Sequence, residues 1–362
     1  MDSTTLSLVA AFLTAALVSA IGLPVIIKAC IYFHLYDEPD GRKVHRKPVP
    51  RLGGLIFLPA AVCGLVAASW MRGKLVGEEF VFGVSTIAMT IGGLMIYAMG
   101  VIDDRFGMKA SQKFVIQTAA ALLLPLCNLV ITDLNGILGL HQIPYIIGYL
   151  LTVMAILTIV NAINLIDGID GLSSGLCILI LLAYMFLFVK TPAIASLNAA
   201  IVGSLVVFWC FNMFGKVGGM KIFMGDAGSL FLGYVCAYMS IKSMMRPIAP
   251  VDCGREQMLI SITLLLIPVL DVMRVAVQRR LTGHGIFEPD KTHIHHVLMN
   301  AGLSMHVTLA CILSLFLLIC VINYALWQCH FPMPLILLTD VAIYGLILGV
   351  LMMMGGGQKV EK

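Results

Sequence analysis

The chain has 362 residues, of which 60% are hydrophobic and only 12% are charged, and its formal net charge is +4. This balance excludes a soluble globular domain and is typical of a polytopic membrane protein. We expect the protein to lie in the membrane and to have no nucleic-acid partner.

Apolar runs of about 20 residues, long enough to cross a hydrocarbon core, follow one another along the chain. We count about eleven and predict an all-α fold in one transmembrane domain over residues 1–362. The first run follows Asp2 and no Lys or Arg, so we expect it to stay in the membrane rather than be cleaved as a signal peptide. The predicted spans are residues 5–27, 53–71, 82–102, 114–132, 144–162, 171–190, 194–213, 226–244, 258–276, 306–326 and 333–354.

The distribution of Lys and Arg predicts the orientation, because short cytoplasmic loops carry an excess of both. With the N-terminus outside, 17 of the 23 basic residues lie on the inner side. An odd number of spans then places the C-terminus in the cytoplasm. The predicted inner-face segments, which would form the active face, lie near residues 28–52, 103–113, 163–174, 214–226 and 277–305.

Two adjacent carboxylates, Asp103 and Asp104, end the third predicted span. Negative charge is unfavourable at a helix C-terminus because the helix dipole opposes it. The structural alternative is a salt bridge to Arg105 or Lys109 at the membrane interface. A single salt bridge does not need two aspartates, so we favour a functional role for the pair.

Residues 161–174 place two amides and two carboxylates between long apolar runs. An ionisable group in such a position must face a cavity, a partner or an ion. If the segment is helical, Asp167 and Asp170 share one face. The alternative is a polar contact between helices that is followed by a glycine turn.

A third cluster begins the eighth predicted span, where Asp226 has glycines on either side. Its carboxylate could serve as a helix N-cap. Capping and metal binding are compatible. The glycines, Gly225 among them, would also allow a phosphate group to approach the backbone closely.

A histidine cluster, His293, His295 and His296, follows the ninth predicted span. Three histidines within four residues, beside a lysine, indicate anion recognition. A structural role and zinc ligation are the alternatives. Upstream, Asp271 is expected to be neutralised by Arg274, which follows three residues later on the same helix face.

The predicted topology brings six carboxylates to one membrane face, where they repel each other unless positive charge offsets them. Carboxylate, amide and phosphate oxygens suit magnesium, whereas zinc fits less well. A phosphate-bearing substrate would explain the basic residues nearby, including Arg46 and Arg280. The six carboxylates belong to Asp103, Asp104, Asp167, Asp170, Asp226 and Asp271.

The ordered motifs resemble those of the polyprenyl-phosphate N-acetylhexosamine-1-phosphate transferases, a glycosyltransferase 4 family that starts lipid-linked glycan assembly in cell wall and polysaccharide synthesis. The resemblance covers nearly the whole chain. It rests on Pro50-Arg-Leu-Gly-Gly, Val-Ile-Asp103-Asp104-Arg, Asn161-Ala-Ile-Asn-Leu-Ile-Asp-Gly-Ile-Asp-Gly-Leu, Phe-Met-Gly-Asp226-Ala-Gly-Ser and His293-Ile-His-His.

The resemblance implies an enzyme that transfers a sugar-1-phosphate from a UDP-sugar to a polyprenyl phosphate lipid and releases UMP. It implies a multi-pass protein of the bacterial inner (plasma) membrane with its active site in the cytoplasm. It also implies a magnesium cofactor, with manganese as a substitute, and it allows a homodimer. We expect direct attack by the lipid phosphate, which is already mostly dianionic at neutral pH because its second pKa is about 6.

The same resemblance assigns roles to single residues. Asp226 and Asn164 would hold the magnesium, and Lys113 would contact the substrate diphosphate. The expected catalytic residues are Asp103, Asp104 and Asp167. The expected substrate-binding residues, besides Lys113, are Asp170, Asn212 and Phe223 at the uridine end, and Gly225, Arg46, Arg280, His293, His295 and His296.

The histidine segment suggests the donor sugar. His293-Ile-His-His-Val-Leu is similar to the WecA-type branch, which uses UDP-N-acetylglucosamine. The branch that uses UDP-N-acetylmuramoyl-pentapeptide has three consecutive histidines followed by Phe-Glu, and it is the alternative. An ion-coupled transporter is the alternative of another class, but it should place its charges deeper and show related halves. Residues 214–221 are a few residues longer than the family pattern, which affects the role of Asn212.

Overall fold

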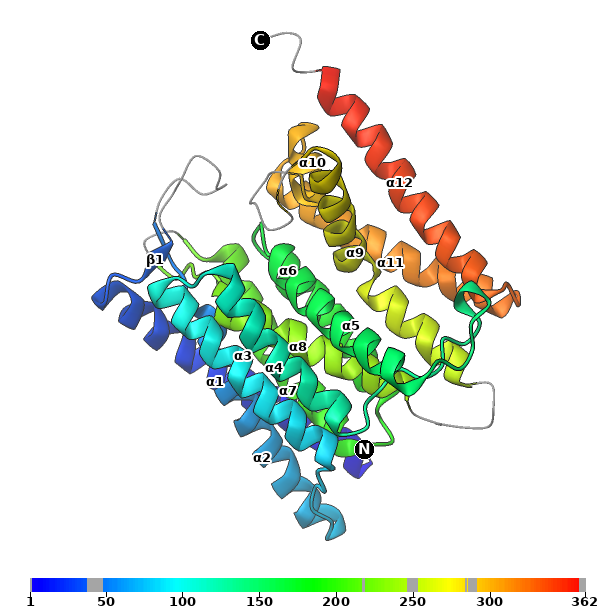
Figure 1. Cartoon of the computed structure of the whole chain (residues 1–362). Coiled ribbons are helices and arrows are strands. Elements are labelled where there is room, and N and C mark those ends of the chain that lie inside the picture. Colours follow the sequence, from blue (N-terminus) through cyan, green and yellow to red (C-terminus); the bar gives the residue numbers. More distant parts are fainter. Residues whose placement is uncertain are drawn as a thin grey trace.

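The computed structural model describes residues 2–37, 48–216, 219–245, 253–283, 285 and 292–357. Helices make up nearly all of this part and run side by side in a bundle (Figure 1). Within these ranges the strands are β1 (Tyr36–Asp37) and β2 (Val49–Pro50), which pair antiparallel. The helices are α1 (Ser3–Tyr32), η1 (Gly53–Ile56), α2 (Phe57–Val76), α3 (Val84–Phe106), α4 (Ala110–Leu126), η2 (Ile137–Gly139), α5 (Tyr145–Leu165), α6 (Leu172–Leu187), α7 (Pro192–Phe214), α8 (Gly225–Met244), α9 (Cys253–Leu281), α10 (Ile294–Asn300), α11 (Met305–Gln328) and α12 (Met333–Gly357).

Helix α8 lies in the middle of the bundle and packs against α3, α5, α6 and α9. Small residues allow its neighbours to approach closely. A Cβ added to Gly233 would lie 2.8 Å from the Cα of Val160 in α5, and one added to Gly100 would lie 2.4 Å from the Cα of Ala227. Both positions require glycine, and the backbone of α8 is therefore fixed against α5 and α3.

Helices α1, α2 and α7 form a second group that packs in the same way. A Cβ on Gly203 of α7 would lie 2.3 Å from the carbonyl oxygen of Phe12 in α1. The hydroxyl of Ser19 donates to that of Ser204 over 2.7 Å between the same helices. The opposite side of α1 exposes apolar residues such as Leu17, as expected of a surface that faces lipid.

Each predicted span coincides with a helix, and the prediction of an all-α polytopic membrane protein is confirmed. In the part of the chain that the structure describes, eight helices are long and apolar enough to cross a membrane. The number eleven stays a prediction, because α4 and α6 have only 17 and 16 residues and α8 is not among these eight helices. The predicted span 114–132 is longer than its helix, because α4 ends at Leu126 and the backbone at Asn128 is left-handed, with a φ of 62°.

The C-terminal helices α9, α11 and α12 lie beside the central group (Figure 1). Asn323 of α11 joins them, because its amide donates to Thr263 of α9 at 2.8 Å and to Asp340 of α12 at 2.9 Å. The short helix α10, which the sequence pattern did not predict, packs on α11 and α12. Helix α10 and strand β1 lie at the same end of the bundle (Figure 1).

Helices extend into the predicted inner-face segments at this end. Helix α1 continues to Tyr32, and only three residues separate α3 from α4. Asp103 and Asp104 therefore lie on the last turn of α3. Helical backbone fixes their positions more firmly than a loop would.

Candidate active site

Residues 50–54 lie against the beginning of α8 through backbone hydrogen bonds. The N–H of Phe223 donates to the carbonyl of Pro50 at 2.8 Å, and the N–H of Gly53 donates back to the carbonyl of Phe223 at 2.9 Å. A Cβ on Gly54 would lie 2.2 Å from the Cα of Gly228. Two sequence motifs far apart in the chain thus meet backbone to backbone, and only glycines permit it.

Asp104 caps the N-terminus of α8. Its carboxylate accepts the backbone N–H groups of Asp226 and Ala227, both at 3.0 Å. Gly225 has a φ of 73°, and a Cβ there would lie 2.6 Å from the same carboxylate. Arg51 donates to the backbone carbonyl of Asp104, with its Nε 3.9 Å from the carboxylate. The capping role considered for Asp226 therefore belongs to Asp104.

Lys113 of α4 connects carboxylates from two other helices. Its ammonium donates to Asp103 of α3 at 2.7 Å and to Asp226 of α8 at 3.0 Å. The salt bridge to Arg105 or Lys109 that was considered for the aspartate pair is not formed among the described residues. One positive charge thus offsets two negative charges at the place where three helix ends meet.

Asn164, near the end of α5, completes this group. Its amide nitrogen donates to Asp226 at 3.2 Å and to the hydroxyl of Ser229 at 2.8 Å. One turn earlier, the amide of Asn161 donates to Gln117 of α4 at 2.8 Å. The two asparagines therefore have different roles. Asn164 contacts Asp226, which forms an acidic group with Asp103 and Asp104, whereas Asn161 connects α5 to α4.

The loop between α5 and α6 corrects one prediction. Asp167 and Asp170 do not share a helix face, because α5 ends at Leu165 and α6 begins at Leu172. Gly171 has a φ of 76° and a Cβ there would meet the side chain of Met213, so the chain turns where only glycine fits. The glycine-turn part of the structural alternative is correct.

Asp167 is half-buried in this loop. Burial raises the pKa of its carboxyl to about 7, and the negative charges of Asp170, Asp226 and Asp104 act in the same direction. Within the described ranges, no hydrogen-bond donor reaches this carboxyl. Asp167 therefore differs from the other acids of the site, which are held by hydrogen bonds.

Asn212 is buried and holds the loop in place. Its side-chain oxygen accepts the N–H of Gly171 at 2.7 Å, and its amide nitrogen donates to the carbonyl of Ile222 at 2.9 Å. It thereby joins the loop after α5 to the segment before α8. These two bonds are a structural function that the resemblance did not assign.

Asp170 points toward the same segment. It forms an ion pair with Lys221, whose ammonium lies 5.9 Å from the centre of the Phe223 ring. An acid, a base and an aromatic ring thus lie together. The uridine-binding role of Asp170 and Phe223 stays a prediction. Lys221 was not among the predicted site residues.

The histidine segment is fixed by Asp271, which is 1% exposed. Its carboxylate accepts from Arg274 at 2.8 Å, from the backbone N–H of Ile294 at 2.9 Å and from the hydroxyl of Tyr344 at 3.0 Å. The Nδ1 of His293 lies 2.7 Å from its second oxygen. The predicted pairing with Arg274 is confirmed, and α12 is an additional, unexpected partner.

His295 brings the histidine segment to the active loop. A Cβ added to Gly168 would lie 2.1 Å from the Nε2 of His295, so the ring lies directly on the glycine after Asp167. The rings of His293 and His295 are parallel, with centres 6.0 Å apart, and His296 lies beside them. Burial lowers the pKa of His295 to about 3, and the neighbouring histidines act in the same direction. The ring is therefore neutral at physiological pH.

The structure brings most of the predicted site residues to one end of the bundle. Arg280 is exposed at the end of α9, whereas the adjacent Arg279 is buried. Arg46 lies outside the described residues. The sequence analysis missed Lys221 and Tyr344, and gave Arg51 no role of its own. Arg51 could have been found from its place in the Pro50-Arg-Leu-Gly-Gly motif, whereas nothing local marks Tyr344.

The donor set at the start of α8 fits a hard cation. Asp226 supplies carboxylate oxygens, and Asn164 supplies an amide directly beside them. In the described part of the chain, no three His, Cys, Asp or Glu side chains are grouped as a metal site. Proteins bind magnesium through one or two carboxylates together with substrate phosphates, and Asp226 offers a ligand of this kind. Zinc, the alternative for the histidines, prefers a closed set of protein ligands.

Comparison with known proteins places this site in a family. The family model described as glycosyl transferase family 4 matches residues 86–244. A probable undecaprenyl-phosphate N-acetylglucosaminyl 1-phosphate transferase of Bacillus subtilis is 30% identical over 318 residues, which cover 84% of this chain and 80% of that protein.

Two further relatives come from other bacteria. A decaprenyl-phosphate N-acetylglucosaminephosphotransferase of Mycolicibacterium smegmatis is 29% identical over 80% of this chain and 75% of its own length. An undecaprenyl-phosphate alpha-N-acetylglucosaminyl 1-phosphate transferase of Escherichia coli K12 is 27% identical over 74% of this chain and 70% of its own length. The region that the family matches includes Asp103, Lys113, Asp167 and Asp226, but ends before the histidine segment.

Proposed function

The chain belongs to glycosyl transferase family 4, and from this premise we propose that it transfers N-acetylglucosamine 1-phosphate from a UDP-sugar to a polyprenyl phosphate lipid. It is a membrane enzyme that makes the first lipid-linked sugar of a glycan. The observation that carries the proposal is the group of Asp103, Lys113 and Asp226, which combines acids and a base at one end of an apolar bundle. A lipid phosphate and a water-soluble nucleotide can meet at such a boundary.

The reaction balances without an external oxidant or base. An oxygen of the lipid phosphate forms a bond to the phosphorus that carries the sugar, and the bridging bond to the uridine-bearing phosphorus breaks. UMP leaves with the electron pair of that bond. The products are the polyprenyl-diphosphate sugar and UMP. Because both reactants are anions, positioning and charge neutralisation dominate catalysis.

Lys113 supplies the positive charge for the diphosphate. In the free protein its ammonium contacts Asp103 and Asp226. When the diphosphate binds, phosphate oxygens take part of this coordination. Asp226 and Asn164 would hold magnesium, which would neutralise the charge that develops on the leaving phosphate.

Asp103 and Asp167 face the acceptor in this proposal. Asp103 lies beside Lys113 and helps to orient the ammonium toward the phosphates. Asp167 has no hydrogen-bond donor among the described residues and a raised pKa of about 7. It can therefore take the proton of a lipid phosphate that arrives as the monoanion.

The donor is UDP-N-acetylglucosamine in this proposal, since the three relatives described above are named for N-acetylglucosamine. Asp170, Lys221 and Phe223 form the uridine end, and the buried His295 supports the loop at Gly168 from behind, while the partly exposed His296 is the histidine that can reach a substrate. We place the active end at the cytoplasmic side of a bacterial inner membrane, where nucleotide sugars are available. The homodimer stays a prediction.

Purified protein tests the proposal when it receives labelled UDP-N-acetylglucosamine, undecaprenyl phosphate and magnesium, with and without a chelator. We expect UMP release and lipid-extractable label that disappears with the chelator. UDP-N-acetylmuramoyl-pentapeptide, as a parallel substrate, should give no product. Lipid labelling only with the pentapeptide nucleotide would correct the donor. Folded protein that labels no lipid with any UDP-sugar would refute the enzyme.

A further inference from the structure

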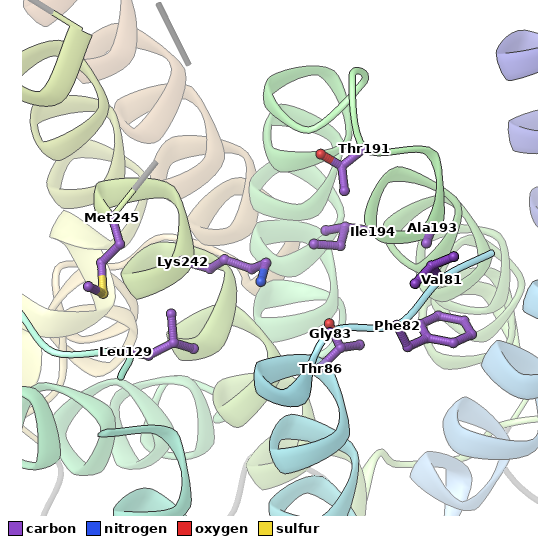
Figure 2. A pocket seen from close by; sticks show the side chains of 10 residues that line it. All are labelled: Val81, Phe82, Gly83, Thr86, Leu129, Thr191, Ala193, Ile194, Lys242 and Met245. Carbon is purple, nitrogen blue, oxygen red and sulfur yellow. The ribbon is translucent and has the colours of Figure 1, made fainter. Parts of the chain in front are cut away.

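Figure 2 shows a cavity of about 210 Å³. It lies at the end of the bundle opposite to the candidate active site, which contains the end of α3 and the beginning of α8. It is bounded by the beginning of α3 at Thr86, the beginning of α7 at Ile194 and the end of α8 at Lys242. Thr86 precedes Asp103 by 17 residues on α3, which corresponds to about 25 Å along the helix. The cavity is therefore distinct from the site of sugar-phosphate transfer.

Lys242 is the charged residue among those that line the cavity. Its ammonium donates to the hydroxyl of Ser85 at 2.8 Å and lies 5.3 Å from the centre of the Tyr238 ring. In the described ranges it forms no ion pair. The loop before α3 carries Glu78, which is bound to Arg72 at 2.6 Å, and Glu79, and neither lines the cavity. Figure 2 shows the Lys242 side chain extending between residues of α3 and α7. Its positive charge thus faces the cavity without a carboxylate.

Two helix N-termini reinforce this positive charge. Gly83, before α3, and Thr191, before α7, are the N-cap residues of their helices, and both line the cavity. No capping side chain covers the start of α3, because its N-cap residue is a glycine. The N-terminal ends of helices attract anions through their N–H groups and their dipoles. Lys242 and the two helix N-termini therefore all favour an anionic ligand.

An apolar stripe runs along the outside of α3 and begins at Val84, the residue after Gly83 of the cavity lining. Val84, Ile87, Ile91 and Leu94 are all exposed and follow each other at helical spacing, so they form one face. The cavity itself is smaller than a usual ligand pocket, which suits a headgroup rather than a whole lipid. A molecule with an anionic head and an apolar tail matches both features.

We propose that this cavity binds the phosphate group of an anionic phospholipid in the leaflet opposite to the active site. Lys242 and the N-termini of α3 and α7 contact the phosphate, and an acyl chain lies along the stripe from Val84 to Leu94. None of the residues that line the cavity is acidic, so the zwitterionic choline headgroup finds no partner for its cation. The site stands independently of the proposed transferase reaction, because it shares no residue with it.

Native mass spectrometry of the full-length protein in detergent tests this site with phosphatidylglycerol, phosphatidylcholine of the same acyl chains, and inorganic phosphate. We expect one tightly bound phosphatidylglycerol. Lys242→Gln should weaken its binding about tenfold, the effect of losing roughly one charged hydrogen bond. Lys242→Arg should retain it. Lys190→Gln is the matched control, since Lys190 is an exposed lysine at the same end that does not line the cavity.

Equal binding of phosphatidylglycerol by the wild type and Lys242→Gln would overturn the proposal. So would equal binding of phosphatidylcholine. Saturation by inorganic phosphate that phosphatidylglycerol does not displace would identify a free-anion site and overturn the lipid assignment. Unchanged size-exclusion profiles of the variants show that a loss of binding does not come from unfolding.

Discussion

Asp104 and Asp271 are buried carboxylates at the same end of the bundle, but they are held in different ways. Asp104 accepts two backbone N–H groups from the first turn of α8. Asp271 accepts one backbone N–H, from Ile294, and otherwise side chains from α9, α12 and the histidine segment. The first arrangement depends on close backbone packing, and the second depends on the identity of several side chains.

The two carboxylates also differ in where they lie relative to the region that the family model matches. Asp104 and the first turn of α8 lie within residues 86–244, whereas Asp271, His293 and Tyr344 lie beyond it. A side-chain network can be exchanged residue by residue without moving the backbone. We therefore expect the acidic group to provide the phosphate chemistry and the histidine segment to adjust the choice of donor.

The largest effect is expected at the acidic group. Asp226→Asn keeps the shape of the side chain but removes the charge that contacts Lys113 and that would hold magnesium. Turnover should fall roughly 1000-fold or more, as when a preorganised electrostatic group is lost. Lipid labelling by purified, monodisperse protein measures it. Turnover near the wild-type level would remove Asp226 from the metal site.

The second largest effect is expected on stability, at the close backbone contact of Gly54 with α8. Gly54→Ala places a Cβ 2.2 Å from the Cα of Gly228, so α8 or the 50–54 segment must move. Overpacking of this kind destabilises by about 3 kcal/mol, and the thermal midpoint in detergent should drop. Gly73→Ala is the control, because a Cβ there meets nothing within 4 Å. An equal, small change in both variants would show that the close approach is not rigid.

The histidine segment should give a smaller effect on turnover. Asp271→Asn weakens the contacts to Arg274 and His293 while the acidic group stays intact. We expect kcat/KM to fall roughly 30-fold, as for a residue that orients another functional group. The loss should appear mainly in the KM of the UDP-sugar, and Tyr344→Phe should reproduce a weaker version. Lys190→Gln, at an exposed position outside the candidate active site, is the comparison, and an equal loss there would contradict the positioning role.

The stability of the protein should also depend on pH, because the histidine segment contains the buried His295. The pKa of His295 is about 3 in the folded protein, whereas the ordinary pKa of a histidine is 6.5. Below pH 6.5 the unfolded chain takes up a proton that the folded protein does not, so stability is present above this pH and is lost as the pH falls. The loss at pH 5 relative to pH 7 is about 2 kcal/mol. His295→Phe should reduce the difference between thermal midpoints at the two pH values, and an unchanged difference would count against a neutral His295.

The sequence predicted the helices well because their apolar runs have membrane length. It placed their ends less well. The polar residues Asp103 to Arg105 continue α3 to Phe106 because the helix needs no apolar residues once it leaves the lipid. Conversely, the apolar residues after Leu126 are not helical, since Cys127 ends α4 and the chain turns at Asn128.

The site could be predicted as a set of residues, but not as a set of contacts. Motif order indicated that Asp103, Asp226 and Asn164 belong together. It could not show that Asp104 caps α8 or that Tyr344 supports Asp271, because both contacts join residues far apart in the chain. The helical interpretation of Asp167 and Asp170 failed because the spacing fits a helix equally well until the positive φ of Gly171 is known.

The pairing of Arg51 with Phe223 also has a consequence for biosynthesis. About 170 residues separate the two partners, and a ribosome adds roughly 5 to 20 residues per second. The first motif therefore waits in the nascent chain for roughly 10 to 30 seconds before α8 exists. During this time Asp104 has no helix to cap. The site can assemble only after seven helices have been made, so a translation arrest before α8 leaves an inserted protein without an active site.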